Sequence, residues 1–123
     1  MKKEQMSLLK ESQIMKIHYL TGIGALFTVA VHIMFRVIVP FGQSLSFHNV
    51  IMNYHNIPYV VILESILVLV SIHGFNGLRV ILLELRQNTK WENAVNIFTI
   101  VAMVSIVVFG TRTVIIANGF AFR

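Results

Sequence analysis

The stretch LTGIGALFTVAVHIMF, residues 20–35, decides the fold, because it is almost wholly apolar and its one ionisable side chain is His32. It lies in an apolar run over about residues 17–39, and two similar runs follow at about 58–85 and 94–117. A membrane-spanning helix needs about 20 apolar residues at a rise of about 1.5 Å each. The sequence therefore predicts an all-α membrane protein, with three spanning helices in an up-down-up bundle that form one domain over residues 1–123.

The composition excludes several other classes of protein. The chain has 123 residues, of which 56% are hydrophobic and 12% are charged, whereas soluble domains are about 25% charged. The absence of cysteine excludes disulfides, thiolate metal sites and iron–sulfur ligation within this chain. All five acidic residues are glutamates, which leaves little material for paired-carboxylate hydrolysis. The net charge of +5 fits the basic loops of a membrane protein better than nucleic-acid binding.

The segments between the apolar runs set the connections. Pro40 and Pro58 bracket an expected loop over residues 41–57, because proline marks helix ends. The connection over residues 86–93 is short, which predicts that the second and third helices are antiparallel neighbours. The charged N-terminal segment predicts a short interfacial helix over Met6–Met15. The first apolar run is too long for a signal peptide and should be retained.

Basic residues predict the orientation, because they concentrate in cytoplasmic loops. Seven lie at one end of the predicted helices and three at the other. The first group is Lys2, Lys3, Lys10, Lys16, Arg79, Arg86 and Lys90, and the second is Arg36, Arg112 and Arg123. The N-terminus is therefore expected in the cytoplasm and the C-terminus outside, in the cytoplasmic membrane.

His32 is the first polar residue at membrane depth, where polar groups are costly and usually functional. Thr21, Ala25, Thr28 and His32 fall on one stripe of the first helix, and Arg36 continues it outward by one turn. Small residues on such a stripe allow close approach of another helix or of a bulky ligand. The stripe alone does not separate helix packing from cofactor binding.

His73 carries a stronger signal. It lies in SIHGFNGLRVILLEL, where Gly74 and Gly77 remove side-chain bulk near the imidazole. A flat macrocycle stacked on a helix needs such relief, and imidazole is a common axial ligand of haem iron. Arg79 could pair with a haem propionate, and the competing interpretation is close helix packing with Arg79 as an interfacial anchor. The combination favours a ligand.

The two histidines are expected at different depths. A count from the prolines gives an offset of roughly 10 Å at the rise of an α-helix. His32 and His73 therefore predict two haems, each completed by a histidine of another chain, and Arg36 is placed to neutralise propionates of the outer one. His18, His48 and His55 are expected in interfacial or solvated positions.

Two further features have open interpretations. Glu64 points away from His73 on the helical wheel, and it could face a partner subunit, a quinone or a proton path, or bond to a neighbouring helix or a water. On the third helix a packing face is expected from the side chains of Phe98, Ala102, Ser105, Phe109 and Arg112.

The segments LTGIGALFTVAVHIMF and LVSIHGFNGLRVILLEL together resemble the cytochrome b membrane anchors of succinate:quinone oxidoreductases, the succinate dehydrogenases and fumarate reductases. The first segment resembles a ligand helix of the two-haem anchors. In the second, His73 matches the axial histidine, Gly77 the small residue at the haem face and Arg79 a frequent arginine, while Glu84 stands where many relatives carry aspartate. The chain departs from one-haem anchors, whose first helix often has a serine and an arginine for quinone binding near its cytoplasmic start.

The resemblance implies a role in electron transfer. The chain would be one of two small anchors, without catalytic activity of its own, and would bind haem b, with two haems favoured and one possible. Its partners would be a flavoprotein subunit, an iron–sulfur subunit, a second hydrophobic anchor, the lipid bilayer and a membrane quinone as substrate. The charged segment 2–16 and the turn 86–93, with Trp91, are expected to form the docking surface.

Two other classes of function remain open from the sequence. A small transporter or channel subunit would use Glu64 and the histidines as proton or ion ligands. A structural membrane subunit would bind no cofactor. Reduced-minus-oxidised spectra separate both from a cytochrome.

Overall fold

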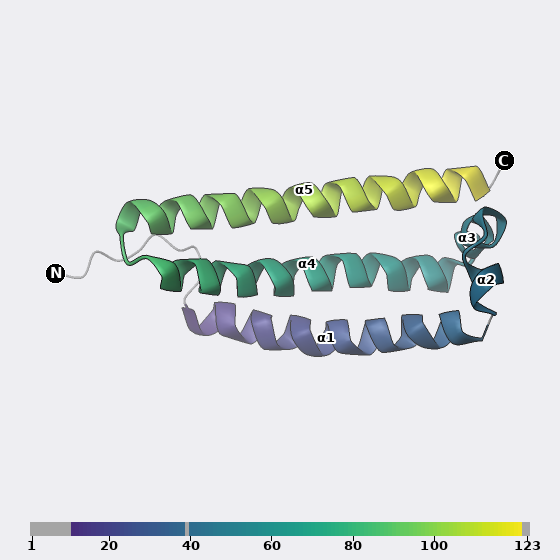
Figure 1. The fold of residues 1–123 in the computed structure, drawn as a ribbon, viewed down its shortest axis with the longest axis horizontal. Coiled ribbons are helices and arrows are strands. Elements are labelled where there is room, and N and C mark those ends of the chain that lie inside the picture. Colours follow the sequence, from purple (N-terminus) through teal and green to yellow (C-terminus); the bar gives the residue numbers. More distant parts are fainter. Residues whose placement is uncertain (1–10, 39, 122–123) are drawn as a thin grey trace.

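The computed structural model describes residues 11–38 and 40–121, and every regular element in that part of the chain is a helix. The three long helices are α1 (Glu11–Val37), α4 (Ile57–Leu85) and α5 (Thr89–Ala121). They run antiparallel in succession, with α4 in the middle (Figure 1). Each is long and apolar enough to cross a membrane. The predicted all-α fold with three spanning helices is confirmed.

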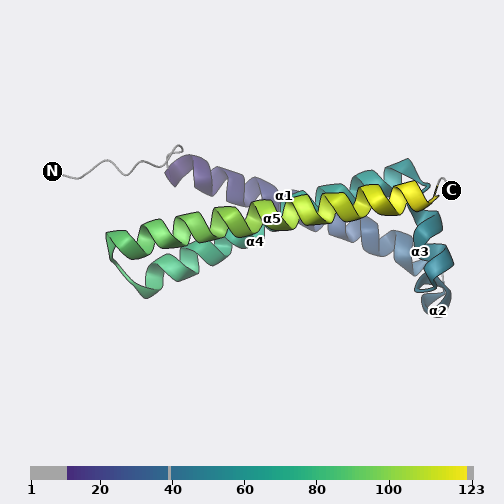
Figure 2. The same ribbon diagram turned by 90° about the horizontal axis from the view of Figure 1, so that it is seen from above.

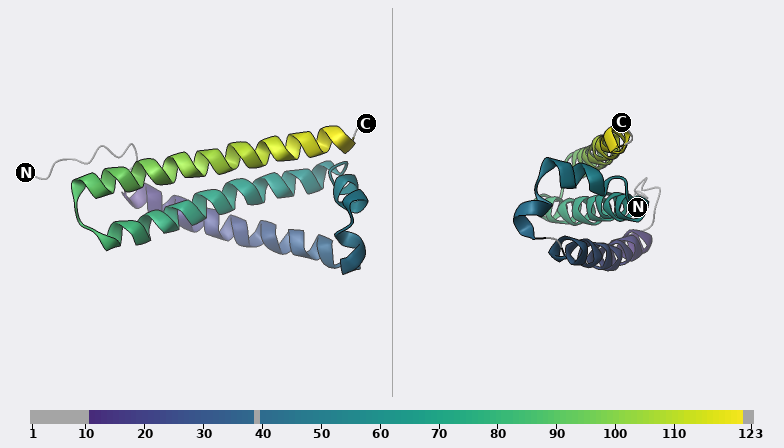
Figure 3. Two further views of the ribbon diagram at one scale, coloured as in Figure 1. Left: turned by 45° about the horizontal axis from the view of Figure 1, so that its top comes forward. Right: turned by 90° about the vertical axis from the view of Figure 1, so that its right-hand side faces the viewer.

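The long helices form a layer rather than a bundle closed around a core. Seen end-on, α5, α4 and α1 lie one above another (Figure 3), and from above α1 crosses the α4–α5 pair obliquely (Figure 2). The buried residues of the three helices are mostly small or hydroxylated: Thr21, Ala25, Tyr59, Ser71, Val95 and Thr99. Many large apolar side chains are exposed on the outer faces, as lipid-facing helices require.

Glycines bring the helices together. A Cβ added at Gly24 of α1 would lie 3.1 Å from Cδ1 of Leu69, and one at Gly110 of α5 would lie 2.5 Å from Cδ2 of Leu67. Leucines of α4 therefore occupy the space that these glycines leave on both neighbouring helices. Close approach over small residues is the usual way in which membrane helices associate.

The segment between the first two spans differs from the expected loop. It contains two short helices, α2 (Phe41–Ser44) and α3 (Phe47–Asn53), which lie across one end of the layer (Figure 3). Ser46 caps α3, because its side chain accepts a hydrogen bond from the backbone N–H of Asn49 over 3.4 Å. The prediction of an irregular connection was wrong for this segment.

The long helices also extend beyond the predicted spans. The third helix was expected from residue 94 but begins at Thr89, because the Asn88 side chain accepts a hydrogen bond from the N–H of Lys90 at 2.9 Å. The interfacial helix expected over Met6–Met15 lies outside the described residues as far as residue 10. Its last five residues form the first turns of α1.

The packing face predicted for the third helix was wrong. Phe98 and Phe109 are 58% and 68% exposed, whereas Val95 and Thr99 are 4% and 3% exposed. The residues that contact α4 are therefore turned away from the expected stripe, toward the side where Gly110 and Thr111 lie. The bulky aromatic face points outward, toward lipid or another chain.

Candidate functional site

The closest contact between histidines joins α1 to α4. The imidazole rings of His18 and His73 are stacked, with centroids 4.1 Å apart and planes inclined by 12°. Nδ1 of His73 lies 2.9 Å from the carbonyl oxygen of His18. Since a carbonyl can only accept, Nδ1 carries the proton and donates, which leaves Nε2 with a free lone pair. This second-shell bond is the arrangement that orients a metal-binding imidazole.

Sequence reasoning missed His18, which was expected at the headgroup region. The structure packs it between two helices, half-buried, with its Nδ1 atom buried and without a hydrogen-bond partner in the described part of the chain. The signal was available, because His18 continues the stripe of Thr21, Ala25, Thr28 and His32 by one turn in the other direction. The end of an apolar run was taken as the membrane boundary too early.

Glycines shape the surroundings of both rings. A Cβ at Gly22 would lie 2.8 Å from Cε1 of His73, so only glycine admits the imidazole there. A Cβ at Gly77 would lie 3.6 Å from Cε1 of His18, whereas Gly74 has no atom within 4 Å. The space left by Gly77 is thus next to His18, and the open surface lies at Gly74.

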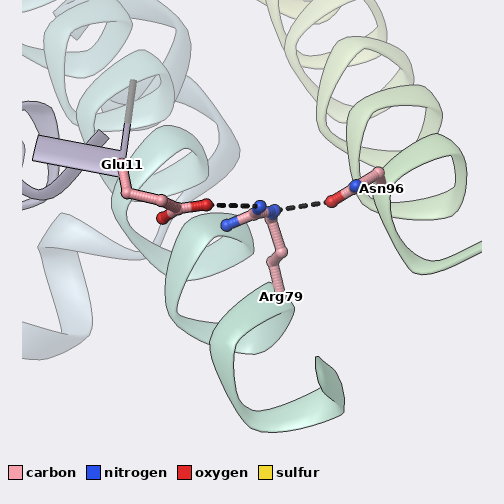
Figure 4. Close-up of polar contacts among 3 residues, drawn as sticks. All are labelled: Glu11, Arg79 and Asn96. Carbon is pink, nitrogen blue, oxygen red and sulfur yellow. Dashed lines mark hydrogen bonds and ion pairs between the residues drawn. The ribbon is translucent and has the colours of Figure 1, made fainter. Parts of the chain in front are cut away.

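Arg79 is held by two other helices, as Figure 4 shows. Its Nε donates to Oδ1 of Asn96 on α5 over 2.6 Å, and its Nη2 forms an ion pair with Oε1 of Glu11 on α1 over 3.4 Å. The arginine side chain is 14% exposed and the glutamate 65%. Arg79 therefore links all three long helices at this end of the layer, and Asn96 is its better-shielded partner.

His32 has different surroundings. Its ring lies against Tyr59 of α4, with centroids 5.8 Å apart and planes inclined by 38°. Its Nδ1 atom is buried and has no partner among the described residues. No backbone carbonyl fixes its orientation as one does for His73.

The structure does not bring His32 and His73 together. His73 stacks on His18, which precedes His32 by 14 residues on the same helix. At the rise of an α-helix this places the two imidazoles about 21 Å apart along α1. The sequence count of roughly 10 Å was too small, because α1 ends at Val37, before Pro40, and crosses α4 obliquely.

A cavity of about 310 Å³ lies one turn beyond His32, at the end covered by α2 and α3. Arg36 and Tyr59 line it together with residues of both short helices. Nearby, burial and the influence of Tyr59 raise the pKa of Tyr54 above its ordinary value, so this phenol is neutral near pH 7. It adds no negative charge beside Arg36.

Glu64 joins α4 to α5. The hydroxyl of Thr111 donates to Oε1 of Glu64 over 2.5 Å, while Oε2 is buried and has no partner in the described part. Of the roles left open by the sequence, bonding to a neighbouring helix is the one that the structure contains.

The turn between α4 and α5 is held from inside. Nε1 of Trp91 donates to the carbonyl of Leu82 over 2.7 Å, which fixes the start of α5 on the end of α4. The exposed side chains at this end include Arg86 and Lys90. The turn therefore offers a rigid basic surface at the opposite end from α2 and α3.

The donors fit a haem better than a bare metal ion. Within residues 11–38 and 40–121, no three His, Cys, Asp or Glu side chains gather to hold an ion. A haem iron needs only axial ligands from protein. Nε2 of His73 is free to serve as one, since Nδ1 is occupied by the carbonyl of His18. The stacked His18 ring cannot supply the opposite ligand, so this would come from another chain.

The fold and these residues define a class: a helical membrane subunit with histidines between its spans. The family model of succinate dehydrogenase/fumarate reductase transmembrane subunits matches residues 4–111. The chain therefore belongs to this family, whose members are multi-pass membrane subunits of an oxidoreductase complex. The comparisons find no match to the chain among curated proteins or among solved structures.

Proposed function

We propose that this chain is a haem b-binding anchor that passes electrons between an iron–sulfur subunit and a membrane quinone. Family membership supports the anchor role. The observation that carries the haem assignment is the bond from Nδ1 of His73 to the carbonyl of His18, which leaves Nε2 as the ligating nitrogen. The chain has no catalytic role of its own and acts as a single membrane domain.

His73 is the axial ligand of the inner haem in this proposal. When bound, a haem supplies a one-electron carrier to the complex. Gly22 admits the imidazole, the carbonyl of His18 fixes its tautomer, and Gly77 keeps the neighbouring surface low. Arg79 is the propionate partner, and the exchange of its exposed partner Glu11 for a propionate would leave the bond to Asn96 intact.

His32 is the axial ligand of an outer haem, with Arg36 as a cation at its rim. The buried Nδ1 atom without a partner and the separation of about 21 Å from His73 support a second site rather than a shared one. Two haems are therefore favoured, although one remains compatible with the His73 site alone. The opposite axial ligands would come from a second hydrophobic anchor subunit.

The remaining assignments follow the charges. The basic α4–α5 turn is proposed to face the cytoplasm and to dock the iron–sulfur and flavoprotein subunits, with the chain in the cytoplasmic membrane. Trp91 holds that surface in place through its bond to Leu82. The transporter alternative has less support, because Glu64 is bonded to Thr111 inside a helix contact.

Reduced-minus-oxidised spectra of the purified complex test the proposal. The wild type should show a b-type α-band, and His73→Ala should remove the inner-haem component. His48→Ala is the matched control, because His48 is exposed on α3. A wild-type complex without haem absorbance would support the cofactor-free alternative instead.

A further inference from the structure

The cavity at the outer end of the layer collects hydrogen-bond donors around one cation. Side chains from the end of α1, from α2 and α3, and from the start of α4 line it, among them Arg36, Ser44, Asn49, Asn53, Asn56 and Tyr59. Ser44 and Tyr59 are buried and Arg36 is half-buried. The lining contains no carboxylate.

Arg36 has no counter-charge within the part of the chain that the structure describes. The chain has no aspartate, and its described glutamates are four. Glu11 pairs with Arg79, Glu64 bonds to Thr111 on the other side of α4, and Glu84 and Glu92 lie at the far end. A partly buried guanidinium without an anion is costly. An external anion would remove this cost.

The polar side chains around Arg36 suit the same ligand. Ser44 and Asn49 donate to the carbonyls of Phe41 and Gln43, which holds the short helices in place. The side chains of Asn53 and Asn56 form no hydrogen bond among the described residues. Their amides and the Tyr59 hydroxyl can therefore donate to oxygen atoms of a ligand bound by Arg36.

The position of the cavity indicates the source of the anion. On α2 and α3, Phe41 and Phe47 are each 79% exposed, and Leu45 and Met52 are also exposed. Apolar side chains on short helices at the end of membrane spans place this segment in the interface between acyl chains and headgroups. Phospholipid phosphates lie at that depth.

We propose that this cavity binds the phosphate of a phospholipid from the leaflet that surrounds α2 and α3. Arg36 pairs with two phosphate oxygens through its planar fork, and Asn53, Asn56 and Tyr59 donate to the remaining oxygens. The lipid would brace the connection between α1 and α4. This site is independent of the haem assignment, although a haem propionate presents the same oxyanion chemistry.

The test uses the purified complex and phosphatidylglycerol as the probe. The complex is stripped of lipid in detergent, titrated with phosphatidylglycerol, and its bound lipid is counted by native mass spectrometry. Arg36→Gln should weaken the tightest lipid-binding event at least tenfold, as expected for a charge-assisted hydrogen bond. Arg36→Lys should restore part of it, and Arg112→Gln, which changes an exposed arginine on α5, should bind as the wild type does.

Three outcomes would overturn the proposal. The first is a lipid count in Arg36→Gln equal to that of the wild type. The second is a loss of haem absorbance in Arg36→Gln at an unchanged lipid count, which would identify a propionate as the anion. The third is saturation of the site by inorganic phosphate alone with the same affinity, which would identify a free-anion site. Arg36→Lys keeps the test valid if Arg36→Gln fails to assemble.

Discussion

The two ends of the α1–α4 contact treat the same residue types differently. At the inner end, His73 donates to a backbone carbonyl and Arg79 is paired with Glu11 and Asn96. At the outer end, Nδ1 of His32 has no partner and Arg36 has no carboxylate within the described residues. The chain by itself thus builds a preformed site at one end and leaves the other to be completed by something else.

This difference has a structural basis in the crossing of the helices. Glycine at position 22 allows α1 and α4 to approach closely enough for a backbone carbonyl to reach His73. Near His32 the bulky Tyr59 stands between the helices instead. A histidine in a membrane is therefore informative chiefly through what orients it.

The largest effect is expected from Gly22→Leu. The added side chain would occupy the position of the His73 ring, because even a Cβ lies 2.8 Å from Cε1. The spectrum of the purified complex should lose the His73-dependent band as fully as in His73→Ala. Gly119→Leu is the control, since a Cβ there meets no atom within 4 Å, and retention of the band in Gly22→Leu would contradict the preformed site.

A partial effect is expected from His32→Ala. If each histidine serves its own haem, the variant loses one haem and keeps the other, because the two rings are about 21 Å apart along the helix. Haem-to-protein stoichiometry measures this directly. An unchanged stoichiometry would return His32 to helix packing against Tyr59.

A smaller effect is expected from Thr111→Val. The variant removes the donor to Glu64 and should lower the free energy of unfolding by about 1 kcal/mol, as is typical of one hydrogen bond between membrane helices. Unfolding in a detergent titration measures the change. Thr113→Val is the control because its hydroxyl bonds only to the carbonyl of Phe109 in its own helix, and equal losses in both variants would deny the α4–α5 bond its role.

The smallest effect is expected from Glu11→Gln. The carboxylate is mostly exposed, so its ion pair with Arg79 should contribute less than about 1 kcal/mol and weaken with salt. Thermal unfolding at low and high ionic strength measures this contribution. A large loss that does not depend on salt would show that Glu11, rather than Asn96, holds Arg79.

The three spans were predictable because about 20 apolar residues dominate every other signal. Their ends were not, since capping by Asn88 and Ser46 acts through single hydrogen bonds that hydropathy does not register. The exposed face of Phe98 and Phe109 was assigned to packing because, in a membrane, bulk does not mark the inside of a protein.

The site was predictable in part. His73 stands out because histidine, glycine and arginine occur together on one helix. The place of His18 beside it depends on the crossing of two helices, which no single segment encodes. The partners of Arg79 lie 68 and 17 residues away in the chain, so their choice also required the tertiary structure.

The most direct test of the account is chemical rescue of His73→Gly in the purified complex. The cavity left by the imidazole should abolish the inner-haem band, and added free imidazole should restore it by supplying the missing axial nitrogen. His48→Gly treated in the same way should show no change. An inner-haem band that persists in His73→Gly without imidazole would contradict the claim that His73 binds the iron.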